Sequence, residues 1–185
     1  FWSKLAKKNI DWIEDFKTVC SGSAPFFKWF EEGKLNISSN CLDRHVGKNK
    51  KAIIHISEDN KKTSINYDEL YISVNNFSYS LKKLGLVKGD RVIIYMPTIP
   101  EAIIAMLACA RLGVIHSIVF AGFSSESLKD RINDCNAKIG ITVNAFKRNG
   151  KIIEAKKTVD HALSLGCPSF EKCIIYKTIN DNTKL

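Results

Sequence analysis

The second half of the chain alternates apolar runs with helical patterns, and this alternation restricts its fold more than any other feature. Strand-length apolar runs occur at residues 52–56, 91–96, 114–120, 137–143 and 172–176. Helical patterns separate the last four of these runs, at residues 101–112, 124–133 and 151–164. Strands and helices that alternate through short loops form parallel sheets with right-handed crossovers. The sequence therefore predicts an α/β fold, with a parallel sheet and helices on both of its faces.

Two helices carry further signals. Asn66 precedes one helical pattern and Glu69 follows three residues later, which is the spacing of a capping box. We expect this helix over residues 67–84. The helix at residues 101–112 is apolar almost all round, so we expect it to be buried between layers of the fold.

The loops that follow the strands are the first place to look for a ligand site. Ligands of open parallel sheets bind beyond the carboxyl ends of the strands. That edge is expected to hold residues 97–100, 120–124 and 144–150. The chain has neither the three-glycine dinucleotide fingerprint nor a Gly-Lys-Ser/Thr phosphate loop. The residue types alone therefore leave the kind of ligand open.

Two of these loops have a functional and a structural interpretation. In "VFAGFSSESL", residues 119–128, a structural corner is favoured over a binding loop, with Gly122 adopting a backbone shape closed to other residues. Lys147, Arg148 and Lys151 form a basic segment just before the expected helix at 151–164. Together with the positive end of that helix they could hold a phosphate. An exposed basic loop is the alternative.

The net charge of +9 raises nucleic acid, an anionic membrane or a phosphorylated ligand as partners. The lysines are scattered along the chain, and arginine, which reads bases better, is scarce beside lysine. A solvated basic surface is favoured. The chain also lacks a run of roughly 20 apolar residues that would span a membrane. We therefore expect neither a nucleic-acid partner nor a membrane partner.

The cysteines and histidines do not suggest a reactive centre. The six cysteines are irregularly spaced without a Cys-x-x-Cys pair, so a zinc site is not expected. Buried structural thiols in a reducing compartment are favoured, with Cys109 acting as a small hydrophobic residue. The four histidines are far apart, and none lies in a recognisable nucleophile pattern. No catalytic or metal-binding residue is assigned.

The first fifty residues differ from the rest. A short amphipathic helix is expected over residues 1–8, followed by a crowd of aromatic residues between 12 and 30. Such a density suits a segment draped over a larger body. We expect residues 1–50 to form an irregular extension and residues 51–185 to form an incomplete α/β subdomain. Neither terminus has a natural appearance, and a piece of a longer polypeptide is expected.

Several runs together resemble one enzyme family. They are "FWSKLAKKNIDW", "KWFEEGKLNISSNCLDRHV", "KGDRVIIYMPTIPEAIIAMLACARLGVIHSIVFAGFSSESLKDRI" and "GKIIEAKKTVDHAL". They resemble the acetyl-coenzyme A synthetase family of acyl-adenylate-forming enzymes, over nearly the whole chain. The resemblance implies ligation of acetate to coenzyme A through an acetyl-adenylate, with ATP and Mg²⁺. It also implies that this chain holds the N-terminal extension and the first α/β subdomain, whereas the catalytic groups, the acetate pocket and the ATP and Mg²⁺ sites lie in other parts of the enzyme.

The same resemblance implies one binding site within this chain. Arg148, Asn149, Gly150 and Lys151 match a basic run that holds the nucleotide end of coenzyme A in the family. Phe120, Ala121 and Gly122 match a Phe-Gly-Gly turn beside that ligand. The sequence departs from the pattern at three positions: Asn149 is larger than the usual small residue, Lys151 replaces Arg in some members, and Ala121 replaces Gly.

Alternatives remain at this point. Propionate is a second possible acid, because the acid pocket lies outside these residues. A non-catalytic α/β module that binds a nucleotide or a protein is a third interpretation. The remainder of the same polypeptide is an expected partner, and the expected location is the cytoplasm, with a nuclear or organellar pool as an option.

Overall fold

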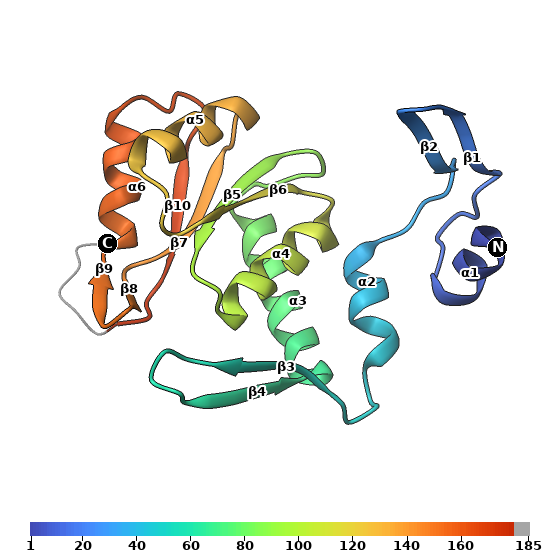
Figure 1. The fold of residues 1–185 in the computed structure, drawn as a ribbon, viewed down its shortest axis with the longest axis horizontal. Coiled ribbons are helices and arrows are strands. Elements are labelled where there is room, and N and C mark those ends of the chain that lie inside the picture. Colours follow the sequence, from blue (N-terminus) through green and yellow to red (C-terminus); the bar gives the residue numbers. More distant parts are fainter. Residues whose placement is uncertain (180–185) are drawn as a thin grey trace.

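A computed structural model describes residues 1–179 of the chain (Figure 1). The first half holds α1 (Trp2–Asn9), β1 (Thr18–Ser23), β2 (Phe26–Glu31), α2 (Ile37–Cys41), the 3₁₀ helix η1 (Asp43–His45), β3 (Lys51–Ile56), β4 (Lys62–Asn66) and α3 (Tyr67–Lys83). The second half holds β5 (Arg91–Met96), α4 (Pro100–Leu112), β6 (Ile115–Phe120), α5 (Ser125–Cys135), β7 (Ile139–Val143), β8 (Phe146–Arg148), β9 (Lys151–Ile153), α6 (Ala155–Ser164) and β10 (Lys172–Tyr176).

The centre of the molecule is a parallel four-stranded sheet with the strand order β10-β7-β5-β6. Strands β5 and β10 have the bounds expected from the sequence, and β6 and β7 lie within the expected runs. Strand β5 is buried at five of its six positions, because it lies between β6 and β7 and is covered on both faces. The core of the fold is therefore built around β5.

The strand order explains why helices cover both faces. The chain passes from β5 to β6 through α4, then crosses β5 to reach β7 through α5, and continues in that direction to β10 through α6. Because such crossovers are right-handed, a reversal of direction places α4 on one face and α5 and α6 on the other. Figure 1 shows this arrangement, with α3 beside α4. The expected α/β fold with helices on both faces is confirmed.

Helix α3 begins at the expected capping box. The Asn66 side chain accepts a hydrogen bond from the backbone N–H of Glu69 at 2.8 Å, and the Glu69 carboxylate accepts one from the N–H of Asn66 at 2.8 Å. Leu70, Val74 and Leu81 lie on one face of the helix and are buried. This face attaches α3 to α4 and hence to the sheet.

Helix α4 is less covered than its composition predicts. Ala105, Ala108 and Cys109 are buried, but the side of the helix that carries Ile103 remains partly exposed. Helix α4 contacts β6, which is the edge strand of the described sheet, so within residues 1–179 no strand lies beyond β6 to extend the layer. The expectation of a helix buried all round is wrong for this part of the chain.

The burial expected of the cysteines holds for only some of them. Cys109 is fully buried, and burial raises the pKa of its thiol to about 12, as expected of a small core residue. Cys20 and Cys41 are exposed instead. Cys20 lies on β1 and Cys41 ends α2, and neither element carries its cysteine into the core.

Two antiparallel hairpins in the α/β part were not expected. Strands β3 and β4 form one, and β8 and β9 form the other. The second hairpin corrects the expected helix at 151–164, because residues 151–153 are strand β9 and α6 begins only at Ala155. Asn149 and Gly150, with φ of 51° and 73°, form the tight turn of this hairpin. An Asn-Gly pair favours such a turn.

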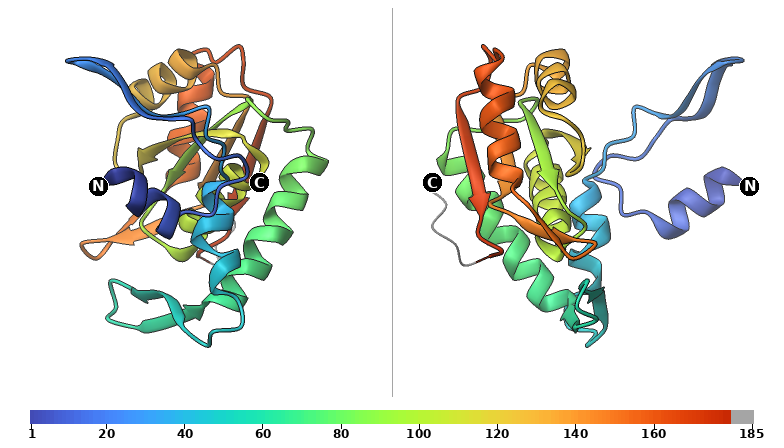
Figure 2. Two further views of the ribbon diagram at one scale, coloured as in Figure 1. Left: turned by 90° about the vertical axis from the view of Figure 1, so that its right-hand side faces the viewer. Right: turned by 60° about the vertical axis from the view of Figure 1, so that its left-hand side comes forward.

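Within the N-terminal extension expected over residues 1–50, α1 and the β1–β2 hairpin project from the α/β body (Figure 2). The rings of Trp12, Phe16 and Phe30 pack against one another with centroid distances of 4.9–5.8 Å. Phe26 and Trp29 on β2 remain exposed. The packing of this extension on a larger body stays a prediction.

Helix α2 and η1 attach the extension to the body. The Asn36 side chain donates hydrogen bonds to the carbonyls of Ala110 and Arg111 at the end of α4, at 3.2 and 3.1 Å. Asp43 forms an ion pair with Arg111, whose guanidinium also lies over the ring of Tyr71. No helix among residues 1–179 combines the length and the apolar character needed to cross a bilayer.

Candidate functional site

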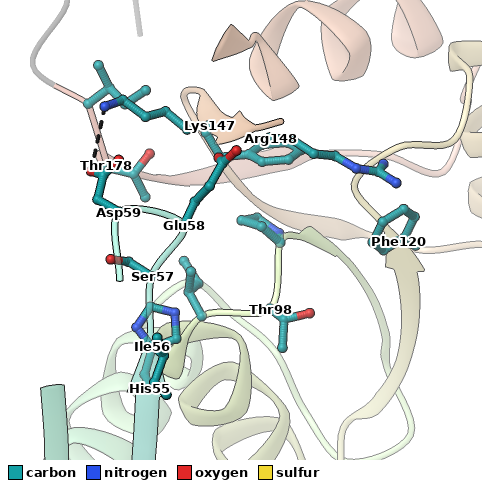
Figure 3. Close-up of a pocket in the computed structure, with 14 residues that line it drawn as sticks. His55, Ile56, Ser57, Glu58, Asp59, Thr98, Phe120, Lys147, Arg148 and Thr178 are labelled. Atoms are coloured by element: carbon teal, nitrogen blue, oxygen red, sulfur yellow. Dashed lines mark ion pairs between the residues drawn. The ribbon is translucent and has the colours of Figure 1, made fainter. Parts of the chain in front are cut away.

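A pocket of about 550 Å³ lies at the carboxyl edge of the sheet (Figure 3). All three segments expected at this edge line it, through residues 97–99, Phe120 and residues 146–148. The tip of the β3–β4 hairpin, at residues 55–59, and residues 178–179 complete the lining. These last two segments could not be predicted from the sequence, because their position depends on how distant parts of the chain fold together.

The strand order places the pocket here. The loop after β5 leads to α4 on one face, whereas the loops after β6 and β7 lead to the opposite face. Neighbouring loops that diverge in this way leave a crevice above the strand ends, where ligands of such sheets bind. The pocket therefore lies at the switch point of the sheet.

Two sequence segments that were expected to share one site meet beside this pocket. The guanidinium of Arg148 lies over the ring of Phe120, with its central carbon 4.9 Å from the ring centroid. Arg148 comes from β8 and Phe120 from the end of β6. This distance is typical of a cation–π contact. Figure 3 shows Arg148 extended towards Phe120 along the pocket edge.

The contact between Arg148 and Phe120 requires a residue without a side chain at position 122. A Cβ atom added at Gly122 would lie 2.7 Å from Nη1 of Arg148 and 2.7 Å from a ring carbon of Phe120. Gly122 is not among the residues with positive φ, so the expectation of a backbone shape closed to other residues is wrong. What the position requires is the absence of a side chain where Arg148 and Phe120 approach the backbone.

The turn that carries Gly122 is stabilised by hydrogen bonds within the turn and from strand β5. The N–H of Phe123 donates to the carbonyl of Phe120 at 3.1 Å, and Ala121 is fully buried. The hydroxyl of Tyr95 donates to the carbonyl of Phe123 at 3.0 Å. Burial raises the pKa of Tyr95, which keeps the phenol protonated as a donor. The turn is therefore a structural corner whose first residue, Phe120, lines the pocket.

The β8–β9 hairpin presents two cations on one face. Arg148 and Lys151 are direct partners across the antiparallel pair, so their side chains emerge on the same side. Neither forms an ion pair with another residue in the range 1–179. Like charges directly opposite one another destabilise a hairpin, and a bound anion would relieve that repulsion. Because Lys151 lies in β9, the helix dipole expected to assist it is not next to it.

The turn residues have a local explanation. Asn149 and Gly150 both have positive φ, which Asn and Gly tolerate better than other residues. The larger side chain at position 149 therefore suits the turn, and it is exposed. The sequence signal for this hairpin was the Asn-Gly pair itself.

Lys147 does not join the two other cations. It precedes Arg148 on β8 and points to the opposite side, where its Nζ lies 3.6 Å from a carboxylate oxygen of Asp59. Glu58, beside Asp59, accepts a hydrogen bond from the N–H of Gly150 at 2.7 Å. The basic segment is thus divided into a neutralised face and a face with two cations.

Asn144 anchors the end of β7 to the segment after β10. Its buried side chain accepts a hydrogen bond from the N–H of Thr178 at 2.8 Å and donates one to the carbonyl of Ile179 at 2.7 Å. These bonds hold residues 178–179 against the pocket.

The fold is an α/β fold with a pocket at the carboxyl edge of its parallel sheet, and the comparisons with known proteins identify the family to which it belongs. The family model described as "AMP-binding enzyme" matches residues 42–183. The chain therefore belongs to the AMP-binding enzyme family. The model described as "Acetyl-coenzyme A synthetase N-terminus" matches residues 1–41.

The relatives narrow the class further. The chain is 52% identical over 179 residues to the acetyl-coenzyme A synthetase of Laribacter hongkongensis, which covers 95% of this chain and 27% of that protein. It is 53% identical over 180 residues to that of Wolinella succinogenes, covering 95% and 28%, and 48% identical over 186 residues to that of Pasteurella multocida, covering 99% and 28%. The chain thus spans just over a quarter of the length of these relatives.

A solved structure has the same fold. Acetoacetyl-CoA synthetase from Streptomyces lividans superposes on the whole of this chain with a TM-score of 0.90 and 24% identity, over 29% of its own length. This likeness supports the assignment of the sheet and its helices, and the family assignment depends on the sequence matches.

Proposed function

We propose that this chain forms the first part of an enzyme that joins acetate to coenzyme A at the expense of ATP, through an acetyl-adenylate and with Mg²⁺. The family match and the names of the relatives support the reaction class. The groups that perform the chemistry are assigned to other parts of the enzyme. A location in the cytoplasm stays a prediction.

We further propose that the Arg148 site binds the phosphorylated nucleotide end of coenzyme A. One observation carries this proposal: two cations without acidic partners in residues 1–179 emerge on one face of a hairpin, beside an exposed aromatic ring. Arg148, Lys151 and the turn residues Asn149 and Gly150 would hold the phosphate, with Phe120, Ala121 and Gly122 forming the adjoining wall. Coenzyme A supplies the thiol that accepts the acetyl group.

The geometry fits an anion attached to a flat ring. Arg148 has donors in a rigid fork that suits phosphate, and Lys151 adds a point charge from the opposite strand. The exposed face of Phe120 offers a surface for a purine. The absence of a side chain at Gly122 allows the ring and the guanidinium to lie this close to the backbone of the turn. None of these groups has to transfer a proton, so their role is binding.

The test is made in the full-length protein with Arg148→Ala. We expect the dissociation constant of coenzyme A, measured by calorimetry, to rise about tenfold, the effect of one charged hydrogen bond at an exposed site. Dephospho-coenzyme A, which lacks the 3′-phosphate, should show a smaller change. Adenylate formation from acetate and ATP, followed by isotope exchange with pyrophosphate, should be unchanged.

Arg131→Ala provides the matched control. Arg131 lies over Phe123 at 5.1 Å, an equivalent stacked guanidinium in the same turn region, but it comes from α5 instead of the hairpin. We expect this variant to bind coenzyme A like the unmodified protein. An unchanged affinity in Arg148→Ala, or a loss of adenylate formation alone, would show that the assignment of Arg148 is wrong. Turnover of acetate and propionate by the unmodified protein decides which acid is preferred.

A further inference from the structure

The tip of the β3–β4 hairpin contacts the β8–β9 hairpin at its turn, outside the face that carries Arg148 and Lys151. A carboxylate oxygen of Glu58 lies 2.7 Å from the backbone nitrogen of Gly150, although the two residues are 92 positions apart. The tip is ordered by its own bonds, because the N–H of Ser57 donates to the carbonyl of Lys61 at 3.0 Å and the N–H of Asn60 to that of Ser57 at 2.9 Å. A structured tip therefore presents Glu58 to the second hairpin.

The N–H of Gly150 is available to an acceptor from outside its own hairpin. Gly150 is the second central residue of a two-residue turn, and Arg148 and Lys151 form the strand pair that the turn closes. In such a turn the central N–H groups point away from the strand-to-strand hydrogen bonds. Glu58 supplies a charged acceptor to one of them, and this fixes the turn relative to the tip.

The same tip holds the neighbouring residue of β8. Asp59 pairs with Lys147 at 3.6 Å, on the side of the strand opposite to Arg148 (Figure 3). The hairpin is therefore attached to the tip through its turn and through Lys147. Its other face, which carries Arg148 and Lys151, remains free for a ligand.

We infer that Glu58 is a positioning residue for the binding of coenzyme A. Its carboxylate holds the turn at Gly150, and the turn sets the position of Arg148 and Lys151. Glu58 acts through the backbone of the hairpin and not by touching the ligand. This inference depends on the proposed coenzyme A site.

The hydrogen bond and the negative charge of Glu58 have opposite effects on the affinity of the site for an anion. Glu58 and Arg148 line the same pocket, so the negative charge of Glu58 opposes the binding of phosphate there. The hydrogen bond to Gly150 favours binding because it orders the cations in advance. Glu58→Gln keeps an oxygen acceptor and removes the charge, whereas Glu58→Ala removes both.

The experiment compares these two variants in the full-length protein. We expect Glu58→Ala to raise the dissociation constant and the KM of coenzyme A by about three- to tenfold, which is the range for the loss of one exposed hydrogen bond. The value of kcat should change little. Glu58→Gln should restore the affinity or exceed it. Hydrogen–deuterium exchange in residues 146–153 should accelerate in Glu58→Ala and return to the original rate in Glu58→Gln.

Glu171→Ala is the control, because Glu171 is an exposed carboxylate just before β10, at the opposite end of the sheet. It should change neither the affinity nor the exchange. If Arg148→Ala weakens the binding of coenzyme A while Glu58→Ala leaves both affinity and exchange unchanged, the positioning role of Glu58 is wrong. The proposed coenzyme A site would then still be supported. If Glu58→Ala accelerates exchange but Arg148→Ala does not weaken coenzyme A binding, the proposed site is wrong and the inference falls with it.

Discussion

Asp90 lies at the amino end of the central strand and shows how one carboxylate stabilises the base of the sheet. It is 6% exposed, and its carboxylate accepts hydrogen bonds from Nζ of Lys138 at 2.6 Å and from the N–H of Val87 at 2.9 Å. The hydrogen bond from Lys138, followed by that from Val87, lowers the pKa of Asp90 below its ordinary value of 3.8. The pair joins the loop before β5 to the residue before β7.

The sign of this shift sets a pH dependence. Because the folded state lowers the pKa, the stabilisation by Asp90 is complete above about pH 4 and is lost as the pH falls through the folded-state pKa. Asp90→Asn should lower the free energy of unfolding at pH 7 by about 1–2 kcal/mol, since Lys138 is partly exposed. Urea unfolding at pH 7 and at lower pH should show a flatter acid dependence in the variant.

Asp130→Asn is the control for this prediction. A carboxylate oxygen of Asp130 lies 3.0 Å from Nζ of Lys129, and the Asp130 side chain is 71% exposed. The loss of this ion pair should therefore change the free energy of unfolding only slightly. Equal losses of stability in the two variants would contradict the account of Asp90.

The residues of the site differ in how far sequence could place them. Phe120 ends β6 and Arg148 follows β7, and the carboxyl ends of these parallel strands share an edge, so their proximity was predictable. The role of Gly122 was not, because it depends on the rotamer by which Arg148 reaches the turn. Glu58 carries no local signal, since its partner is 92 residues away on another hairpin.

At the scale of elements, the capping box of α3 is a contact whose strength can be measured. Asn66→Ala removes the acceptor for the N–H of Glu69 and should lower the free energy of unfolding by about 1 kcal/mol. Asn76→Ala, at an exposed position within the same helix, is the matched control and should be neutral or slightly stabilising, because alanine favours helix. Chemical denaturation of both variants provides the comparison, and equal effects would count against the cap.

The elements that sequence predicted well are those with strong periodicity and clear ends. Helix α3 combines an apolar face with a capping box, and β5 is apolar from Val92 to Met96. The β8–β9 hairpin was missed because three-residue strands are too short to show a period of two. Its Asn-Gly turn was visible, but the helical pattern that follows obscured the strand at 151–153.

At the scale of the whole molecule, the described chain leaves apolar surface uncovered. Ile115 and Ile118 are 57% and 51% exposed on β6, which is the edge strand of the described sheet. Phe26 on the N-terminal hairpin is 83% exposed. Long apolar edges of this kind promote association between chains.

We therefore expect residues 1–185, prepared alone, to self-associate. Light scattering after size-exclusion chromatography should give a mass that rises with concentration. Ile118→Lys, which places a charge on the exposed edge, should lower the association. A single monomer mass at all concentrations would contradict the expectation that the exposed apolar residues of β6 and of the N-terminal hairpin pack against other parts of the protein.

The strand order also determines how the sheet must form during synthesis on a ribosome. Strands β5 and β6 can pair once residue 120 has left the exit tunnel, but the other side of β5 is filled only by β7, at residues 139–143. Between these two moments strand β5, which is buried at five of its six positions in the folded protein, has one open side. Translation that pauses in this interval would expose β5 to chaperones and to neighbouring nascent chains, whereas pausing once residue 143 has left the tunnel would not.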